Sequence, residues 1–150
     1  MCILEDTPIQ IPVVGEAEEV QVLYYKVRSV HRRRGNPNKC IWTISLEEEV
    51  NCFRCSALKK WLEDKEGWGL KFNATNGYLE QVGVSEINEE LKIAKFVDSS
   101  STTEWHGYPA DYCSRNNDRP SLKVLEDWMN NKIINKTKMS KIKQYKQCNL

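Results

Sequence analysis

The chain has 150 residues, with 22 basic and 21 acidic side chains and a formal net charge of +1 at pH 7. No apolar run approaches the roughly 20 residues that span a bilayer, which excludes a membrane-spanning protein and gives no reason to expect a membrane partner. The length favours a single domain over residues 1–150, or else a division into an α+β core at 1–98 and a loop with a helical hairpin at 104–150. Because no secretory signal pattern opens the chain, we expect a cytoplasmic location.

The first part of the chain predicts a β-hairpin with a basic tip. Residues 20–30 are rich in β-branched and aromatic side chains, and residues 39–44 form a shorter stretch of the same kind. Between them, residues 35–37 read Gly-Asn-Pro, a sequence typical of turns. Because positions 32–34 are all arginine, we expect the tip of this hairpin to carry positive charge.

A long helix should follow this hairpin. Ser45 and Glu48 have the spacing of a capping box, in which each side chain accepts a hydrogen bond from the other residue's backbone amide. Apolar side chains then recur with the 3.6-residue period of a helix, and Gly67 ends the pattern. We therefore expect one helix over residues 46–65.

The middle of the chain predicts a second hairpin and one ambiguous segment. The dipeptide at 76–77 is Asn-Gly, the strongest short signal for a hairpin turn, and it lies between apolar segments at 70–72 and 78–82. Residues 85–98 fit both a helix and a strand. We expect a helix at the start of that segment and a strand at its end.

The last part of the chain predicts two consecutive helices. Pro120 suits the first turn of a helix, and an apolar stripe over residues 122–129 follows it. Asn135 is a suitable N-cap for a second helix, which is rich in lysine. We therefore expect an α+β fold, in which an antiparallel sheet of two β-hairpins packs on one long helix and a C-terminal αα-hairpin closes or extends it.

The near-neutral net charge hides three charged segments. Residues 1–19 contain five acidic and no basic side chains, whereas residues 26–39 and residues 132–146 each contain six basic and no acidic side chains. Such basic segments favour an anionic partner, either nucleic acid or an acidic protein surface. The residues that we assign to this contact are Arg32, Arg33, Arg34, Lys138 and Lys141. The alternative is a solvated face, or a frayed tail in the case of the C-terminal lysines.

Residues 105–113 concentrate more chemical groups than any other stretch of the chain. Three aromatic rings, an imidazole, a carboxylate and a thiol lie in a segment that we expect to be a loop. His106 would act as an acid or base with Asp111 fixing its tautomer, and Arg119 would clamp an anionic group, including that of a small-molecule ligand. The residues that we assign to ligand or partner binding are Trp105, His106, Tyr108, Tyr112 and Arg119. The alternative is that the rings cover the edge of the core and that His106 bonds a carbonyl group.

Cys52 and Cys55 have the C-x-x-C spacing that occurs in metal and redox sites. A structural zinc site commonly uses two such pairs, and the sequence contains no second pair. Buried thiols are also common core residues. We therefore expect structural thiols and no cofactor. If the chain binds a metal ion, Cys52 and Cys55 are the candidate ligands.

The sequence as a whole favours a small cytoplasmic binding protein that works through contact and not through chemistry. It offers no clear nucleophile and no second catalytic element, so an enzyme is the less favoured class. An inhibitor, an immunity protein or an adaptor fits the size of the chain. The alternative is an enzyme or small-ligand sensor centred on residues 105–112, with His106 as acid or base and Arg119 as anion clamp.

Overall fold

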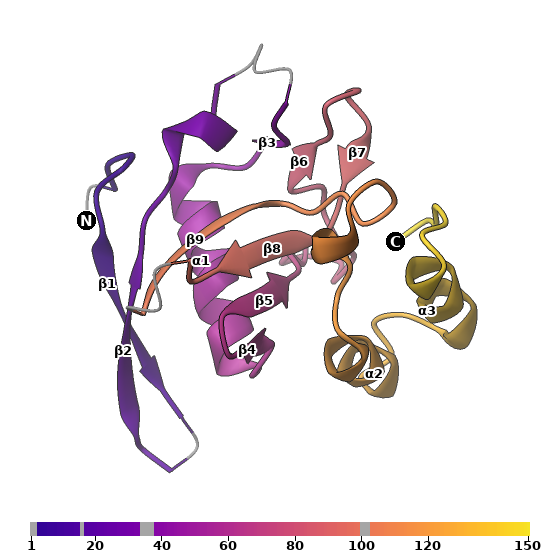
Figure 1. Cartoon of the computed structure of the whole chain (residues 1–150). Coiled ribbons are helices and arrows are strands. Elements are labelled where there is room, and N and C mark those ends of the chain that lie inside the picture. Colours follow the sequence, from indigo (N-terminus) through magenta and orange to yellow (C-terminus); the bar gives the residue numbers. More distant parts are fainter. Residues whose placement is uncertain (1–2, 16, 34–37, 100–102) are drawn as a thin grey trace.

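Helices and strands are mixed along the chain, which confirms the expected α+β class (Figure 1). The computed structural model describes residues 3–15, 17–33, 38–99 and 103–150. The strands are β1 Ile9–Val14, β2 Val20–Tyr25, β3 Ile41–Trp42, β4 Leu62–Glu63, β5 Glu66–Gly69, β6 Gly83–Val84, β7 Glu90–Leu91, β8 Ala94–Val97 and β9 Glu104–Pro109. The helices are α1 Leu46–Leu58, α2 Leu122–Asn130 and α3 Lys136–Lys143, with 3-10 helices η1 Ser29–His31 and η2 Asn116–Asp118.

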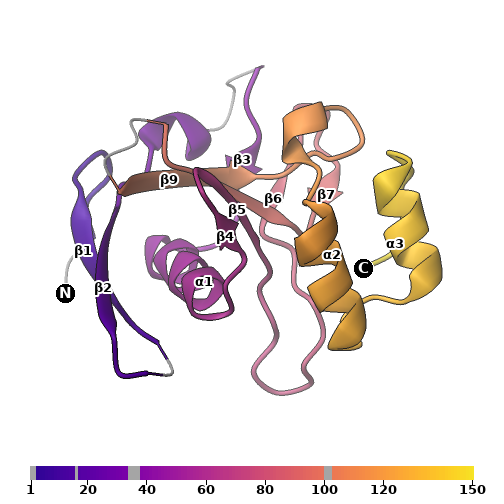
Figure 2. The same ribbon diagram turned by 60° about the horizontal axis from the view of Figure 1, so that its bottom comes forward.

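The larger of the two sheets has the strand order β1-β2-β9-β8-β5-β4, and the smaller has the order β3-β6-β7. Within the larger sheet, β2 and β9 are parallel and the other neighbours are antiparallel. Helix α1 covers one face of this sheet, and η1 and η2 lie on the opposite side (Figure 2). Because β8 and β9 pair along their length, the sheet continues across the division that we considered near residue 98.

The core between α1 and the large sheet is built from aromatic rings. The Phe53 ring lies 5.3 Å from Phe96 and 5.8 Å from Trp105, measured between centroids. Gly107 makes this packing possible, because a Cβ atom there would lie 2.5 Å from the Phe96 ring and 2.8 Å from the Lys95 carbonyl oxygen. Burial alternates along β9, with Trp105, Gly107 and Pro109 buried and the even-numbered positions half-buried.

The capping box at Ser45 and Glu48 is confirmed, but the helix ends at Leu58 and not at residue 65. Lys60 adopts a left-handed backbone conformation with φ of 62°, which turns the chain out of the helix. The segment that follows forms the short hairpin of β4 and β5. The predicted helix end was wrong because the apolar residues Trp61 and Leu62 serve another packing contact.

The first predicted hairpin does not form. Strand β2 pairs with β1 and β9, whereas β3 pairs with β6 in the other sheet. Strand β1 was missed, because Pro12 interrupts its pattern of apolar residues. The predicted turn at 35–37 lies outside the described residues, as does Arg34.

The middle of the chain contains less regular structure than the sequence predicts. The segments at 70–72 and 78–82 meet in a single bridge between Phe72 and Leu79, although Gly77 adopts the positive φ of 72° that its turn requires. The helix expected at the start of 85–98 is absent, and a turn between β6 and β7 takes its place. The strand expected at the end of this segment is β8.

The two C-terminal helices are confirmed and lie side by side (Figures 1 and 2). Ser121 caps α2 and Asn135 caps α3, each by accepting a hydrogen bond from a backbone amide in the first turn. A second core cluster joins this unit to the sheet, since the Trp61 and Trp128 rings pack edge to face at 5.7 Å. Within the described part of the chain, no helix has the length and apolar character needed to cross a membrane.

Candidate functional site

The segment that we expected to be a loop is largely a strand at the centre of the sheet. Strand β9 extends to Pro109, and only residues 110–113 leave the sheet. Trp105 is 4% exposed and belongs to the core beneath α1. The prediction of a loop was wrong because the polar residues of this strand face the side of the sheet without an α-helix, where η2 covers part of them.

That face of the sheet carries a network of polar side chains that anchors η2. The Lys95 ammonium group is buried and lies 2.8 Å from Glu66 Oε1, 2.6 Å from the Asn117 carbonyl oxygen and 4.0 Å from the centre of the Trp68 ring. On the neighbouring strand, the Tyr108 hydroxyl donates to Asp118 Oδ1 at 2.9 Å.

Asp118 completes this network. Its second carboxylate oxygen accepts a hydrogen bond from the Asp111 backbone amide at 2.8 Å. Burial raises the pKa of the Asp118 carboxyl group, although these hydrogen bonds act in the opposite direction. Burial, followed by the Asp118 charge, also raises the pKa of the Tyr108 hydroxyl, which therefore remains a hydrogen-bond donor. The network fixes η2 and the residues that follow it.

The structure does not bring His106 and Asp111 together. His106 Nε2 lies 3.3 Å from the Ser99 hydroxyl, and Nδ1 is buried without a hydrogen-bond partner among the described residues. Burial lowers the pKa of this imidazole, and the charges that act on it most strongly come from Arg28 and Lys26. Asp111 lies beyond the end of β9, where it lines a pocket next to the C-terminal residues. The geometry therefore gives no support to an acid–base pair of these two residues.

Arg32 is engaged within the protein. Its Nη2 atom donates to Glu49 Oε1 at 2.6 Å and to the Ser45 carbonyl oxygen at 3.1 Å, and its Nη1 atom donates to the Ile44 carbonyl oxygen. The Tyr25 hydroxyl donates to the second Glu49 oxygen at 2.5 Å. Burial raises the pKa of the Glu49 carboxyl group to about 7, against the effect of these hydrogen bonds. Arg33, by contrast, is exposed beyond η1.

The predicted residues Arg119, Lys138 and Lys141 belong to one basic region at the C-terminal helices. Lys138 and Lys141 lie on α3, the former half-buried and the latter exposed. Arg119 Nη1 donates to the Lys143 carbonyl oxygen at 2.9 Å, and its guanidinium carbon lies 4.4 Å from the centre of the Tyr145 ring. Beside it is a cavity of about 330 Å³ between η2, the start of α2 and the end of α3.

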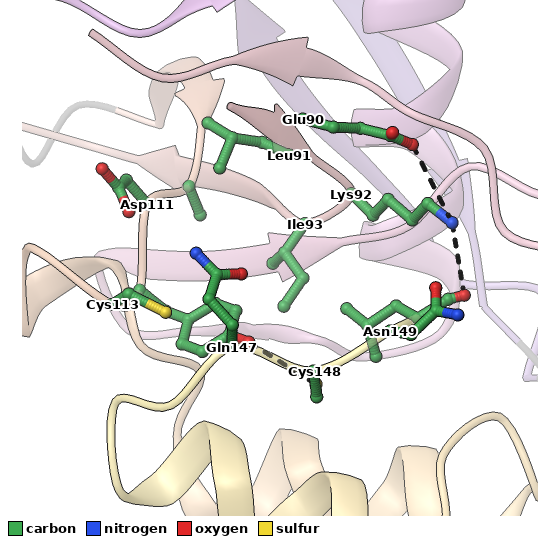
Figure 3. A pocket seen from close by; sticks show the side chains of 12 residues that line it. Glu90, Leu91, Lys92, Ile93, Asp111, Cys113, Gln147, Cys148 and Asn149 are labelled. Carbon is green, nitrogen blue, oxygen red and sulfur yellow. Dashed lines mark hydrogen bonds and ion pairs between the residues drawn. The ribbon is translucent and has the colours of Figure 1, made fainter. Parts of the chain in front are cut away.

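A second, smaller pocket of about 200 Å³ lies where the C-terminal residues return to the sheet (Figure 3). Leu91, Ile93 and Tyr112 contribute apolar surface to it. The Tyr112 hydroxyl donates to the Lys146 carbonyl oxygen at 3.0 Å and lies 3.5 Å from Cys148 Sγ. Tyr112, which we assigned to partner binding, is thus buried and holds the C-terminal segment in place.

The C-x-x-C pair does not form a cluster of ligands. Cys52 is buried with its sulfur 3.6 Å from the Leu70 carbonyl oxygen, and burial raises its pKa to about 12. Cys55 lies on the exposed side of α1. In the described part of the chain, no group of three or more histidine, cysteine or acidic side chains could hold a metal ion.

Three residues of the site were not assigned from the sequence. Lys143 belongs to the acid-free lysine run, and its position near Arg119 depends on the helical hairpin. Lys95 lies between the apolar residues Ala94 and Phe96, and alternation along β8 was the signal that could have placed it opposite α1. Asp118 lies in a polar stretch of the sequence that gives no such signal.

Comparison with known proteins found no family model, no curated protein and no solved structure that matches this chain. The function must therefore be inferred from the site itself.

Proposed function

We propose that this chain is a small binding protein that holds an anionic macromolecule on the lysine-rich surface of its C-terminal helices. We define this surface, the α3 face, by Lys136, Lys138, Lys141 and Lys143 on α3, which flank the buried Met139 and Ile142 on both sides, together with Lys132 before the helix and Lys146 after it. One observation carries the proposal: α3 is a capped and packed helix, yet its lysines have no acidic partners among the residues that the structure describes. Residues 128–150 contain no acidic side chain, and the ion pairs between described residues involve none of these six lysines.

A frayed tail does not account for these lysines. Asn135 caps the helix through Lys138 N at 2.8 Å, and Met139 and Ile142 are buried against the second core cluster. The Lys146 carbonyl oxygen accepts the hydrogen bond of Tyr112 beyond the end of the helix. The lysines are therefore presented from a fixed support, which lowers the entropy that is lost when a partner binds.

The lysines at the start of α3 do not stabilise the fold. Lys136 and Lys138 lie in the first turn, where the helix dipole disfavours a cation, and no acidic residue occurs there. Lys138 and Lys141 are also three residues apart, a spacing at which like charges cost about 0.2–0.5 kcal/mol. Burial of Met139 and Ile142 offsets these costs, so the positive charge is best explained by a partner with negative charge.

The test is binding of fluorescent polyanions across a salt series. The probes are a random-sequence oligonucleotide, single- and double-stranded, and polyglutamate. We expect binding that weakens steeply with salt, because released counterions drive such contacts. Absence of binding to both kinds of probe at low salt would overturn the proposal.

A matched pair of variants locates the contact. The triple variant Lys136→Glu, Lys138→Glu and Lys141→Glu reverses the α3 face. The control Lys59→Glu, Lys60→Glu and Lys65→Glu makes the same change in net charge at exposed positions after α1 and between β4 and β5. We expect the first variant to lose binding and the control to retain most of it. Equal losses would show that only net charge matters and that the α3 face is not the site.

A further inference from the structure

We propose that the cavity between η2, α2 and α3 is a phosphate-binding subsite for a nucleic-acid strand, with Arg119 and Lys143 as its cationic residues. This inference rests on the proposed function and names the class of partner. The cavity, of about 330 Å³, falls within the range of about 300–1,000 Å³ that is typical of ligand sites. Its lining includes Glu66, Trp68, Asn117, Arg119, Leu122 and Lys143.

Arg119 is held in place before any ligand arrives. The Lys143 carbonyl oxygen accepts from its Nη1 at 2.9 Å, and the Tyr145 ring lies against its guanidinium group, with 4.4 Å between the guanidinium carbon and the ring centre. Its Nε and Nη2 atoms donate to no acceptor among the described residues. A fixed planar fork with free donors matches the paired oxygens of a phosphate group.

The charge of the lining also favours an anion. Among the described residues that line the cavity, Glu66 is the acidic one, and its carboxylate pairs with the Lys95 ammonium group at 2.8 Å. The Lys95 side chain is 1% exposed, so its positive charge interacts with groups of the protein and not with a ligand in the cavity. Within the described part of the chain, the positive charges of Arg119 and Lys143 therefore remain without a counter-charge.

The surroundings of the cavity favour nucleic acid over an acidic protein. Lys143 lines the cavity, and Lys136 lies seven residues earlier on the same side of α3, about 10 Å away at the 1.5 Å rise per residue of a helix. That length corresponds to about three phosphates of one strand at roughly 3.4 Å along the axis. Leu122 and Leu125 give the cavity an apolar wall beside its cations, which suits a sugar or base next to a phosphate. Asn117 adds a polar residue to the lining of the same cavity.

The first experiment uses the wild-type chain and small probes. Adenosine monophosphate is titrated while the Arg119 Nε–H resonance is followed by NMR, with glutamate at equal ionic strength as the carboxylate probe. We expect a saturable shift of this resonance with the nucleotide and a weaker response to glutamate. An equal response to both probes, or no shift at all, would overturn the assignment of a phosphate subsite.

The second experiment uses single-site variants and the fluorescent oligonucleotide. We expect Arg119→Gln to weaken binding about tenfold or more, since a hydrogen bond between charged groups is lost. Lys143→Gln should lower the salt slope by about one. The control is Lys123→Gln, which removes the same charge from an exposed position of α2 that borders a different pocket. Arg119→Lys keeps the charge and loses the fork, so we expect it to behave like Arg119→Gln.

These outcomes separate the subsite from the proposed function. If the wild type binds oligonucleotide and Arg119→Gln matches Lys123→Gln, the α3 face is the site and the phosphate subsite is wrong. If the wild type binds polyglutamate and not oligonucleotide, the partner is an acidic protein and the subsite is again wrong. If the wild type binds neither oligonucleotide nor polyglutamate, the proposed function is wrong, and the subsite that rests on it is wrong as well. Thermal unfolding of each variant by circular dichroism identifies those that do not fold.

Discussion

Replacement of Arg32 by methionine should destabilise the protein strongly, whereas the same change at Arg33 should not. Glu49 is 0% exposed and Arg32 Nη2 lies 2.6 Å from its carboxylate. Removal of one member of a buried ion pair leaves an unpaired charge and costs about 3–5 kcal/mol. That is a large part of the roughly 5–15 kcal/mol by which a typical domain is stable. Arg33 is exposed, so its replacement should change stability by less than about 0.5 kcal/mol.

The assay is urea unfolding followed by tryptophan fluorescence. With a dependence of about 2 kcal/mol per M of urea, the midpoint of Arg32→Met should fall by roughly 1.5–2.5 M. The loss should shrink at acidic pH, because protonation of Glu49 removes the unpaired charge. Adding Glu49→Gln to Arg32→Met should restore part of the stability, since the amide oxygen can still accept the Tyr25 hydrogen bond. Equal midpoints for Arg32→Met and Arg33→Met would refute this account of the cluster.

Three further predictions concern the sheet, the second core and pH. Gly107→Ala should cost about 1–3 kcal/mol in urea unfolding, because the new Cβ would lie 2.5 Å from the Phe96 ring; an unchanged midpoint would contradict this. Asp127→Ala should cost about 1–3 kcal/mol, because Trp61 Nε1 donates to its carboxylate at 2.6 Å, and Asp127→Asn should lose less in the same assay. Burial raises the pKa of Glu49 from 4.5 to about 7, so its contribution to the free energy of unfolding should fall as pH rises through that window. Glu49→Gln should therefore gain stability relative to wild type between about pH 5 and about pH 8, and a constant difference would refute the shift.

The parts of the fold that were predicted correctly depend on neighbours in sequence. The capping box at Ser45 and the N-cap at Asn135 act within one helical turn. The N-cap of α2, Ser121, was not predicted, because we expected Pro120 in the first turn of this helix and it lies before the cap. The apolar stripe of α2 and the paired helices follow from the same local rules. Ser121 can be recognised as an N-cap only when Pro120 is placed before the helix. The α+β class could therefore be predicted from the sequence.

The errors in the sheet come from pairing between distant segments. Nothing near β2 indicates that its neighbours are β1 and β9 and not the segment at 39–44. Strand β9 resembled a loop because His106 and Tyr108 alternate with buried positions on the side of the sheet away from α1. Tyr108 is covered by the His31 ring of η1 and by the Asp118 carboxylate of η2, and the pattern within β9 indicates neither contact.

The candidate site shows the same division. The sequence offered the lysine run, because a charge segment is a local property, and it offered Arg119 separately, as an anion clamp close to residues 105–113. It could not distinguish Arg32 from Arg33, since only the meeting of η1 with the start of α1 places Arg32 beside Glu49. Nor could it show that Lys143 borders the same cavity as Arg119, which depends on the return of α3 toward η2.

The most direct test of the central claim is the salt dependence of oligonucleotide binding by the wild type and by a variant with Lys136, Lys138 and Lys141 changed to glutamine. If these side chains contact phosphates, the slope of log K against log salt should become less negative by about two to three units, at roughly 0.7–0.9 for each phosphate contact that is lost. An unchanged slope, with unchanged affinity, would contradict the proposal that the α3 face holds the partner.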